Sequence, residues 1–474
     1  MNFISYEYIV FLLIVFFLYW RLQRKYQNLL LLIVSYLFYA WWDWRFVAFI
    51  AISTTFNFVV GQKIDAGAAA RRKRYWLVSG LAFNIGLLVY FKYLNFFIES
   101  FKVLIETVGW HLSTKSLQII IPLGISFYTF RALSYILDIY HHRLNATKSL
   151  INFAAYSAFF PIMIAGPIVR AKEFLYQVEE RRDFDWGDFQ DGCFRILSGV
   201  VKKILIADPI GIYLVDPVFS RPEMFASKTL WIATFAYAVQ IYADFSGYSN
   251  IAIGSSRLLG FRIPENFNFP YLARDFREFW RRWHISMSQF FRDYVYKPLG
   301  GNRKGESRSL LNILITTLVS GLWHGAGWTF IVWGMIHGLG VAVNHLLMGK
   351  PGADKSIFPT RWQMLSVLPG WLITQFIVCL AWVFFRATNL ATAISYIHKL
   401  FVPFGKEEIV IPLLVWVGFI AFAADHAYGW FIQRFPKMMA RIPVTVQAVA
   451  FSIFIVFLYH VVPRQSAAFI YFRF

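Results

Sequence analysis

The chain has 474 residues, of which 58% are hydrophobic and 20% aromatic, whereas only 15% are charged. Ordinary soluble domains carry about 25% charged residues, so this composition excludes a soluble globular protein and predicts a membrane protein. The formal net charge of +20 would indicate nucleic-acid binding in a soluble chain. Here the basic residues separate apolar blocks, which predicts membrane lipids and no nucleic acid as partners.

Apolar blocks long enough to cross a bilayer are predicted along the whole sequence. They are residues 6–20, 28–41, 46–60, 75–90, 231–242, 310–333, 365–385, 409–422 and 444–462. Several are short or interrupted, so we expect an all-α polytopic membrane protein with roughly ten to twelve transmembrane helices. No polar stretch is long enough to enclose a core of its own, which predicts a single membrane domain over residues 1–474.

The first apolar block is expected to remain as a membrane helix rather than to be cleaved as a signal peptide. No basic cluster precedes it, and it ends in Trp20 and Arg21 instead of a small-residue cleavage site. Arg24 and Lys25 follow, and a second basic loop, residues 71–74, comes two helices later. By the positive-inside rule both loops are cytoplasmic, which places the N-terminus outside.

Clusters of proline and glycine interrupt the apolar sequence between residues 120 and 170. IPLGISFYTF contains Pro122 and Gly124, and FFPIMIAGPIVR contains Pro161, Gly166 and Pro167. Lipid does not satisfy the backbone groups that such residues free, so we expect bent or re-entrant helices around a protein-lined cavity.

Polar residues also interrupt the apolar helix predicted around QIYADFSGYSN. Asp244 and Ser246 stand there with Gln240, Ser249 and Asn250. Two interpretations remain open, since these side chains either line a cavity or form hydrogen bonds between helices.

Residues 274–308 depart most from membrane-helix character. RDFREFWRRWHISMSQFFRDYVYKPLGGNRKGESR holds nine Lys or Arg and four Asp or Glu among many aromatic residues. Phe276, Phe279 and Trp283 recur at helical spacing, which predicts an amphipathic segment at the cytoplasmic interface. It either anchors a loop or forms a basic mouth for a polyanionic substrate such as a phosphorylated cofactor, with Arg281 and Arg282 binding the donor.

Two histidines are candidate catalytic groups. His284 lies inside the basic segment, and His324 follows forty residues later in SGLWHGAGWTF. A lone histidine on an apolar helix is commonly a hydrogen-bonded core residue. Gly321 and Gly325, however, leave space beside the imidazole of His324, and an ionisable group at membrane depth is costly enough to indicate function.

The two cysteines, Cys193 and Cys379, lie in or beside apolar sequence without a second ligand at metal spacing. They predict neither a disulfide framework nor a metal site. Buried packing is the expected role of both.

Several strings resemble the membrane-bound O-acyltransferase family, and within it the bacterial branch typified by the membrane subunit of alginate O-acetyltransferase. They are IPLGISFYTFRALSYILDIY, FFPIMIAGPIVR, DFSGYSNIAIG, ENFNFPYLARDFREFWRRWHISMSQFFRDYVYKPLGG, LWHGAGWTFIVWG and AWVFFRA. The resemblance covers residues 120–474. One departure is Arg131, which stands where this branch is expected to carry an uncharged polar residue.

The resemblance implies a helical membrane enzyme with a funnel, in which His324 is the catalytic residue and His284 its partner. Trp323, from the same motif as His324, joins Asp244 and Ser246 as candidate cavity-lining residues. The chemistry agrees, because acyl transfer from a thioester to a hydroxyl needs a base near neutral pKa. It also needs a second group that stabilises the oxyanion or orients the acceptor.

The implied function is O-acetylation of a cell-envelope or extracellular polysaccharide from the bacterial inner membrane. The acetyl group comes from a cytoplasmic thioester, most simply acetyl-CoA as a substrate, with no bound cofactor. A periplasmic acyltransferase partner of the SGNH type and the polysaccharide as final acceptor are expected. Two alternatives stay open: D-alanyl transfer to teichoic acid from a carrier-protein thioester, and a transporter that performs no covalent chemistry.

The sequence ends in AAFIYFRF, residues 467–474, which is too apolar for a solvated tail. We expect this segment to fold back into the membrane domain. It acts either as a packing clamp or, through the phenol of Tyr471, as an acyl relay with His324 as its base. In the second interpretation Tyr471 carries the acetyl group from a cytoplasmic donor to a partner outside.

Overall fold

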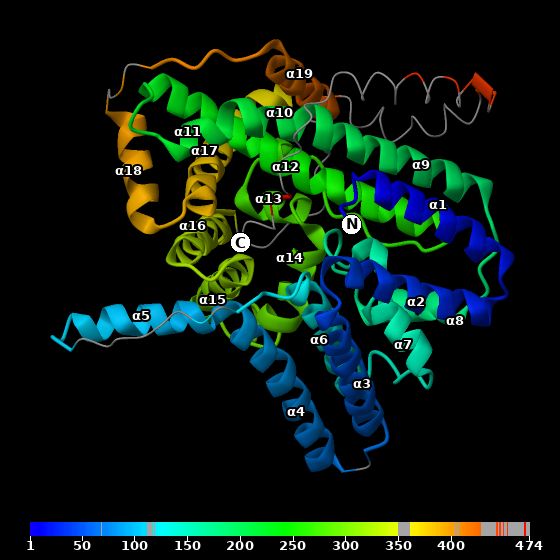
Figure 1. Cartoon of the computed structure of the whole chain (residues 1–474). Helices are drawn as coiled ribbons and strands as arrows, with labels where there is room; N and C mark the ends of the chain where they lie inside the picture. Colours follow the sequence, from blue (N-terminus) through cyan, green and yellow to red (C-terminus); the bar gives the residue numbers. More distant parts are fainter. Residues whose placement is uncertain are drawn as a thin grey trace. The chain divides into compact units, whose positions relative to one another are not determined.

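The computed structural model describes residues 1–67, 69–110, 117, 119–348, 361–402, 405, 407–427, 442–443, 445–446, 449, 453 and 469–470. Within this part of the chain the regular elements are helices, apart from one isolated bridge between Phe225 and Glu407 (Figure 1). The predicted all-α class is confirmed.

The first α-helices are α1 Tyr6–Arg21, α2 Arg24–Asp43, α3 Arg45–Asp65, α4 Ala70–Leu88, α5 Leu94–Glu106, α6 Ile125–Tyr140, α7 Leu150–Ser157, α8 Ala171–Glu179, α9 Trp186–Val201, α10 Asp208–Ile210 and α11 Asp216–Ser220. The later ones are α12 Ser227–Leu258, α13 Phe276–Arg282, α14 Ile285–Phe291, α15 Glu306–His324, α16 Trp328–Met348, α17 Arg361–Arg386, α18 Leu390–Phe401 and α19 Leu413–Ala427. Short 3₁₀ turns are η2 Phe160–Ile162 and η5 Pro270–Leu272, and π-helical turns are η1 Val89–Tyr93, η3 Lys202–Ala207, η4 Gly211–Val215 and η6 Arg292–Tyr296.

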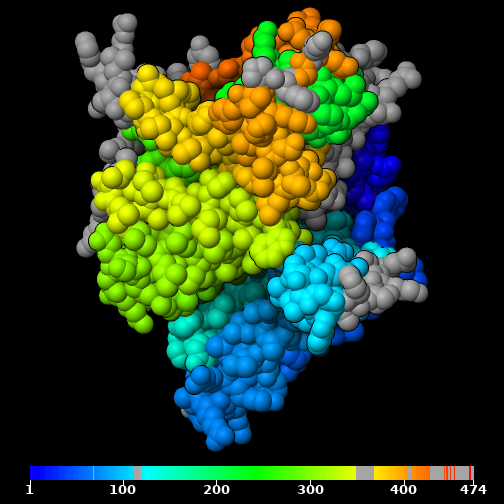
Figure 2. All heavy atoms as spheres, turned by 90° about the vertical axis from the view of Figure 1, so that its left-hand side faces the viewer, coloured from blue at the N-terminus to red at the C-terminus, as the bar shows by residue number. Residues whose placement is uncertain are grey.

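Four stretches in the described residues are long and apolar enough to cross a membrane: Arg45–Asp65, Ala70–Glu106, Trp328–Leu347 and Leu368–Arg386. They agree with a multi-pass membrane protein, but the expected number of ten to twelve spans is not confirmed. Figure 2 shows α15 to α18 side by side, in yellow-green to orange. These helices expose large apolar side chains such as Leu339, Leu372 and Ile394, as lipid-facing surfaces do.

One predicted block is wrong in its extent. Residues 310–333 read as a single apolar run, yet α15 ends at His324 and α16 begins at Trp328. The two helices form a closely packed hairpin because glycines face each other, with Gly321 against the carbonyl oxygen of Phe330 and Gly334 against that of Thr317. A Cβ atom at either glycine would push the helices apart. Hydropathy alone does not detect this turn.

The chain divides into two compact units, residues 1–193 with 252–264 and residues 194–251 with 265–474. The single domain expected for residues 1–474 stays a prediction. The first unit contains α1 to α8, and α2, α3, α4, α6 and α7 pack on one another.

The predicted helix breaks lie in the first unit. Gly124 precedes α6 in the left-handed region at φ 71°, where its α-carbon lies against the carbonyl group of Met163. The fully buried Arg131 donates to the carbonyl oxygens of Tyr156 and Ile162, at 3.2 and 3.4 Å. The guanidinium thus binds carbonyl groups at the end of α7 and in η2, where regular helix is interrupted, which gives the unexpected arginine a structural role.

Candidate active site

The candidate site lies in the second unit. One of its residues, His284, lies between α13 and α14. The backbone of His284 is left-handed at φ 41°, which is unfavourable for a residue other than glycine. A hydrogen bond from the amide of Ile285 to the carbonyl oxygen of Asn266, at 2.9 Å, holds this conformation. Strained backbone of this kind is concentrated at functional sites.

Asn266 fixes the tautomer of the buried His284. Its side-chain oxygen lies 3.0 Å from Nδ1 of His284 and accepts from the hydroxyl group of Ser286 at 2.8 Å. The backbone N–H of Ser286 also donates to this oxygen, at 3.4 Å. The backbone N–H of Ser286 can only donate, so the Asn266 atom that faces it is the oxygen. The same oxygen faces Nδ1 of His284 and can only accept, so Nδ1 carries the hydrogen. Nε2 therefore presents a lone pair, and it has no hydrogen-bond partner among the described residues.

His324 is the last residue of α15 and is only 2% exposed. Its imidazole lies 4.9 Å from the rings of Trp323 and Trp333 and 5.1 Å from that of Phe385. His324 is therefore enclosed by aromatic side chains and shielded from solvent.

Trp323 connects the two histidines. Its ring lies 5.8 Å from His284 and 4.9 Å from His324, measured between ring centroids. Phe245 of α12 lies perpendicular to His284 at 4.7 Å. The structure thus brings together two histidines that the sequence separates, with Trp323 in contact with both.

The expectation that glycines leave open space beside His324 is wrong for two of them. Gly321 lies against the backbone of Phe330, and Gly325 lies against the ring of the same residue. Both glycines permit close packing of α15 on α16, so they position the histidine by packing.

Asp244 and Ser246 are both buried on α12. Asp244 is ion-paired with Lys203 of η3 at 2.7 Å, and its second oxygen accepts from the amide of Ile470, also at 2.7 Å. These contacts join segments of the protein, as the second interpretation of this polar stretch predicts. A cavity-lining role for Asp244, Ser246 and Trp323 stays a prediction.

The C-terminal segment folds back, as far as the structure describes it. Phe469 and Ile470 are buried, at 0% and 3% exposure. Phe469 stacks on Tyr248 of α12 with ring centroids 4.1 Å apart. Tyr471, the predicted relay, lies outside the described residues.

Residues 274–308 contain two short helices, α13 and α14, the π-helical turn η6 and the first residues of α15. Phe276, Phe279 and Trp283 are buried within the second unit, and Trp283 contacts Trp382 of α17 at 4.9 Å. The amphipathic pattern is thus used for packing inside the protein, whereas the interfacial location stays a prediction.

The two candidate donor-binding arginines have different surroundings. Arg282 is buried and bound to Glu278 at 2.6 Å and to the carbonyl oxygen of Asn268 at 3.2 Å. Arg281 is exposed. Arg282 therefore stabilises the fold, and Arg281 remains available at the surface.

Three further residues near the site are not predicted from the sequence. Asn266 stands in the quoted string ENFNFPYL, and Lys203 follows a second lysine in VKKILIAD. His337 is the third, and Gly334, Gly338 and Gly340 lie close to it in the sequence. It is fully buried on α16, with its ring 4.7 Å from that of Trp333.

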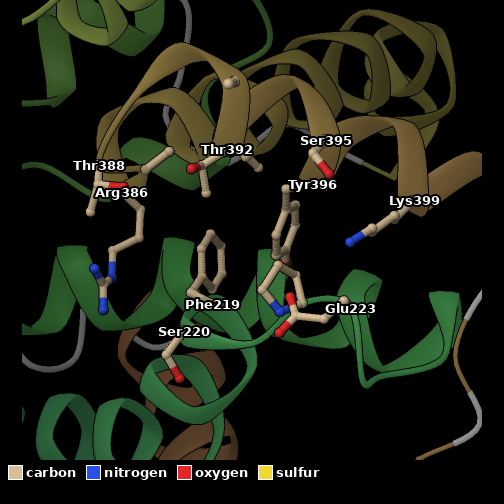
Figure 3. A pocket seen from close by; sticks show the side chains of 13 residues that line it. Phe219, Ser220, Glu223, Arg386, Thr388, Thr392, Ser395, Tyr396 and Lys399 are labelled. Carbon is tan, nitrogen blue, oxygen red and sulfur yellow. The ribbon is translucent and has the colours of Figure 1, made fainter.

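A cavity of about 730 Å³ lies elsewhere in the second unit, between α18, the end of α17 and α11 (Figure 3). Arg386, Thr392, Lys399 and Glu223 are among its lining residues, but neither candidate histidine is. Arg386 is ion-paired with Asp216 at 2.8 Å. In the part of the chain that the structure describes, no three His, Cys, Asp or Glu side chains are grouped as metal ligands.

Two buried histidines that share contact with one tryptophan, in a chain with several membrane-spanning helices, agree with a membrane enzyme that uses imidazole chemistry. The sequence profile of the membrane-bound O-acyltransferase family matches residues 143–383. The "Probable alginate O-acetylase AlgI" of Pseudomonas aeruginosa is 41% identical over 393 residues, covering 83% of this chain and 73% of the relative. The chain belongs to the membrane-bound O-acyltransferase family, and the predicted O-acetyltransferase activity is confirmed.

Two further relatives differ in the reaction that their names describe. The "Peptidoglycan O-acetyltransferase" of Helicobacter pylori is 35% identical over 396 residues, covering 78% of this chain and 73% of the relative. The "Teichoic acid D-alanyltransferase" of Streptococcus thermophilus is 33% identical over 241 residues, covering 48% of this chain and 58% of the relative.

Proposed function

We propose that this protein takes an acetyl group from cytoplasmic acetyl-CoA and passes it across the bacterial inner membrane for O-acetylation of an extracellular polysaccharide. The observation that carries the proposal is the buried arrangement of His284 and His324 around Trp323. The N-terminus is placed outside, as the basic loops predict. The names of the relatives favour alginate as the polymer, since the alginate enzyme of P. aeruginosa has higher identity than the peptidoglycan enzyme.

In the proposed reaction a hydroxyl oxygen attacks the carbonyl carbon of the thioester. His324 accepts the hydroxyl proton, the C–S bond breaks, and the CoA thiolate leaves and takes up a proton. His284 has its hydrogen on Nδ1, directed to Asn266, so Nε2 accepts a hydrogen bond and does not donate one. Of the two roles considered for the second group, this tautomer favours orientation of a hydroxyl over stabilisation of an oxyanion.

The hydroxyl that reacts with the cytoplasmic donor is proposed to be that of Tyr471. A cytoplasmic thioester and an external acceptor lie on opposite sides of the membrane, and a single fixed base does not reach both. The serine of an SGNH-type partner would then take the acetyl group from the ester on Tyr471 at the outer side of the membrane. Burial of Phe469 and Ile470 supports this role, because it anchors the residues that directly precede Tyr471.

The alternatives have less support. The D-alanyltransferase of S. thermophilus matches only 48% of this chain, against 83% for the alginate enzyme of P. aeruginosa. A transporter without covalent chemistry is at odds with the confirmed acyltransferase family. A direct test is release of free thiol from acetyl-CoA by the purified protein in lipid nanodiscs. The proposal predicts release that requires His324, and intact acetyl-CoA with an active preparation would contradict it.

Asn266→Ala is expected to lower kcat about 10- to 100-fold, because the ring of His284 loses the hydrogen bond that selects its tautomer. The KM for acetyl-CoA should change little, since the hydrogen bond of Asn266 acts on the ring of His284. Ser249→Ala is the matched control. It removes the partner of the Asn266 amide group at 3.2 Å but leaves the bond to His284. Equal losses in both variants would show that only packing matters.

Arg281→Gln is expected to raise the KM for acetyl-CoA about 3- to 10-fold with little change in kcat, because an exposed cation contributes uniform binding to the donor phosphates. Steady-state thiol release measures both constants. Arg277→Gln serves as a control from the same short helix. An unchanged KM in Arg281→Gln would assign the basic segment to membrane anchoring.

A further inference from the structure

A buried ionic cluster lies beside the site, formed by Lys203 of η3, Asp208 of α10 and Asp244 of α12. The ammonium group of Lys203 lies 2.7 Å from a carboxylate oxygen of each aspartate. All three side chains are nearly inaccessible, at 1%, 3% and 4% exposure. One ammonium faces two carboxylates here, so additional hydrogen-bond donors are needed to stabilise the negative charge.

The C-terminal segment supplies such a donor. The backbone N–H of Ile470 donates to Oδ2 of Asp244 at 2.7 Å, whereas Lys203 binds Oδ1. The two oxygens of the Asp244 carboxylate therefore have different partners. A hydrogen bond to an ionised acceptor is about twice as strong as a neutral one, and burial protects it from competition with water.

Aromatic contacts connect the C-terminal segment with His284. Phe469 stacks on Tyr248, and its ring centroid lies 6.1 Å from that of Phe245. Phe245 is the residue that lies perpendicular to His284 at 4.7 Å. The ammonium of Lys203 lies 5.8 Å from the ring of Tyr248. The ionic cluster, the stacked pair and His284 thus form one connected set of contacts.

We propose that Asp244, ion-paired with Lys203, is the receptor that binds the C-terminal segment and positions it for acyl transfer. Asp244 is a positioning residue, because it acts on the reaction through the backbone of Ile470. The residue delivered to the site is Tyr471, which follows Ile470 in the sequence. In this respect the inference rests on the proposed relay, although docking of the segment by Asp244 does not depend on it.

A second buried ion pair in the same unit provides a matched control. Asp425 lies 3.2 Å from Lys202 and accepts from the hydroxyl group of Tyr242 at 2.8 Å. It resembles Asp244 in burial and in its lysine partner. Loss of Asp425 should perturb the fold to a similar extent without removing the receptor for Ile470.

The test is hydrogen–deuterium exchange by the full-length protein in nanodiscs, followed in a C-terminal peptide that contains Ile470. Asp244→Ala is expected to accelerate exchange of this peptide about 10- to 100-fold, as loss of a charge-assisted hydrogen bond predicts. Asp425→Ala is expected to leave it protected. Unchanged protection in Asp244→Ala would overturn the proposal, and so would equal deprotection in Asp425→Ala.

Variants of the segment itself keep the test decisive if Asp244→Ala fails to fold. Ile470→Pro removes the N–H donor and leaves the ionic cluster intact, whereas Ile470→Val keeps the donor. The expected result is faster exchange at positions 471–474 and loss of polymer acetylation in Ile470→Pro only. Protection and activity that persist in Ile470→Pro would overturn the proposal.

The same measurements separate the docking proposal from the relay. If Asp244→Ala releases the segment but acetylation continues, Asp244 binds the segment, but its positioning role in acyl transfer and the relay are both contradicted. If the segment stays protected in Asp244→Ala while Tyr471→Phe is inactive, the relay stands and docking by Asp244 fails.

Discussion

His324→Ala is expected to reduce polymer acetylation by about 10²- to 10⁴-fold, the usual contribution of a general base. The reason is that the variant has no group to accept the hydroxyl proton during attack on the thioester. The protein should still insert and accumulate, because the lost packing costs about 1–3 kcal/mol, which does not by itself unfold a typical domain. Acetylation of the polymer in cells and thiol release in nanodiscs measure the effect.

Two controls separate chemistry from packing in this experiment. His324→Asn retains a polar group of intermediate size but supplies no base. His345→Ala removes a histidine from α16 that is not among the aromatic neighbours of His324. The first variant is expected to be as inactive as His324→Ala, and the second is expected to be active. Wild-type acetylation by a stable His324→Ala protein would refute the mechanism.

Tyr471→Phe is expected to abolish acetylation of the polymer while the protein remains folded. This substitution keeps the aromatic ring and deletes only the hydroxyl group, which the relay requires as its nucleophile. Tyr75→Phe, at an exposed tyrosine of α4, is the matched control and should be fully active. Full activity in Tyr471→Phe would leave the C-terminal segment as a packing clamp.

Much of the fold could be predicted from hydropathy, because long apolar helices are specified by composition. The blocks 6–20, 28–41 and 46–60 all lie within observed helices. The turn between His324 and Trp328 was missed, since an apolar hairpin has the same hydropathy as one long helix. Glycine packing of α15 on α16 distinguishes the two, and it depends on contacts between residues.

The site was predictable in part. His284 and His324 could be selected from local sequence, because ionisable groups in apolar surroundings are costly. Their common contact with Trp323 could not, since it depends on tertiary packing of α14 and α15. Asn266 acts through a hydrogen bond across eighteen residues, and no local pattern identifies it as the partner of His284.

The basic segment shows why charge pattern alone misleads. Arg281 and Arg282 are adjacent and chemically identical in the sequence, so both were expected to bind the donor. In the structure Arg282 is buried against Glu278, four residues earlier on the same helix. Which arginine is buried depends on how α13 packs, and local sequence does not determine that.

The most direct test of the central claim is mass spectrometry of the C-terminal peptide after the purified protein has been incubated with acetyl-CoA in the absence of its partner. The relay mechanism predicts an acetyl ester on Tyr471 in the wild-type protein. It predicts no ester in His324→Ala, and none at this position in Tyr471→Phe. An unmodified C-terminal peptide from wild-type protein that releases thiol and supports polymer acetylation when the partner is restored would contradict the account.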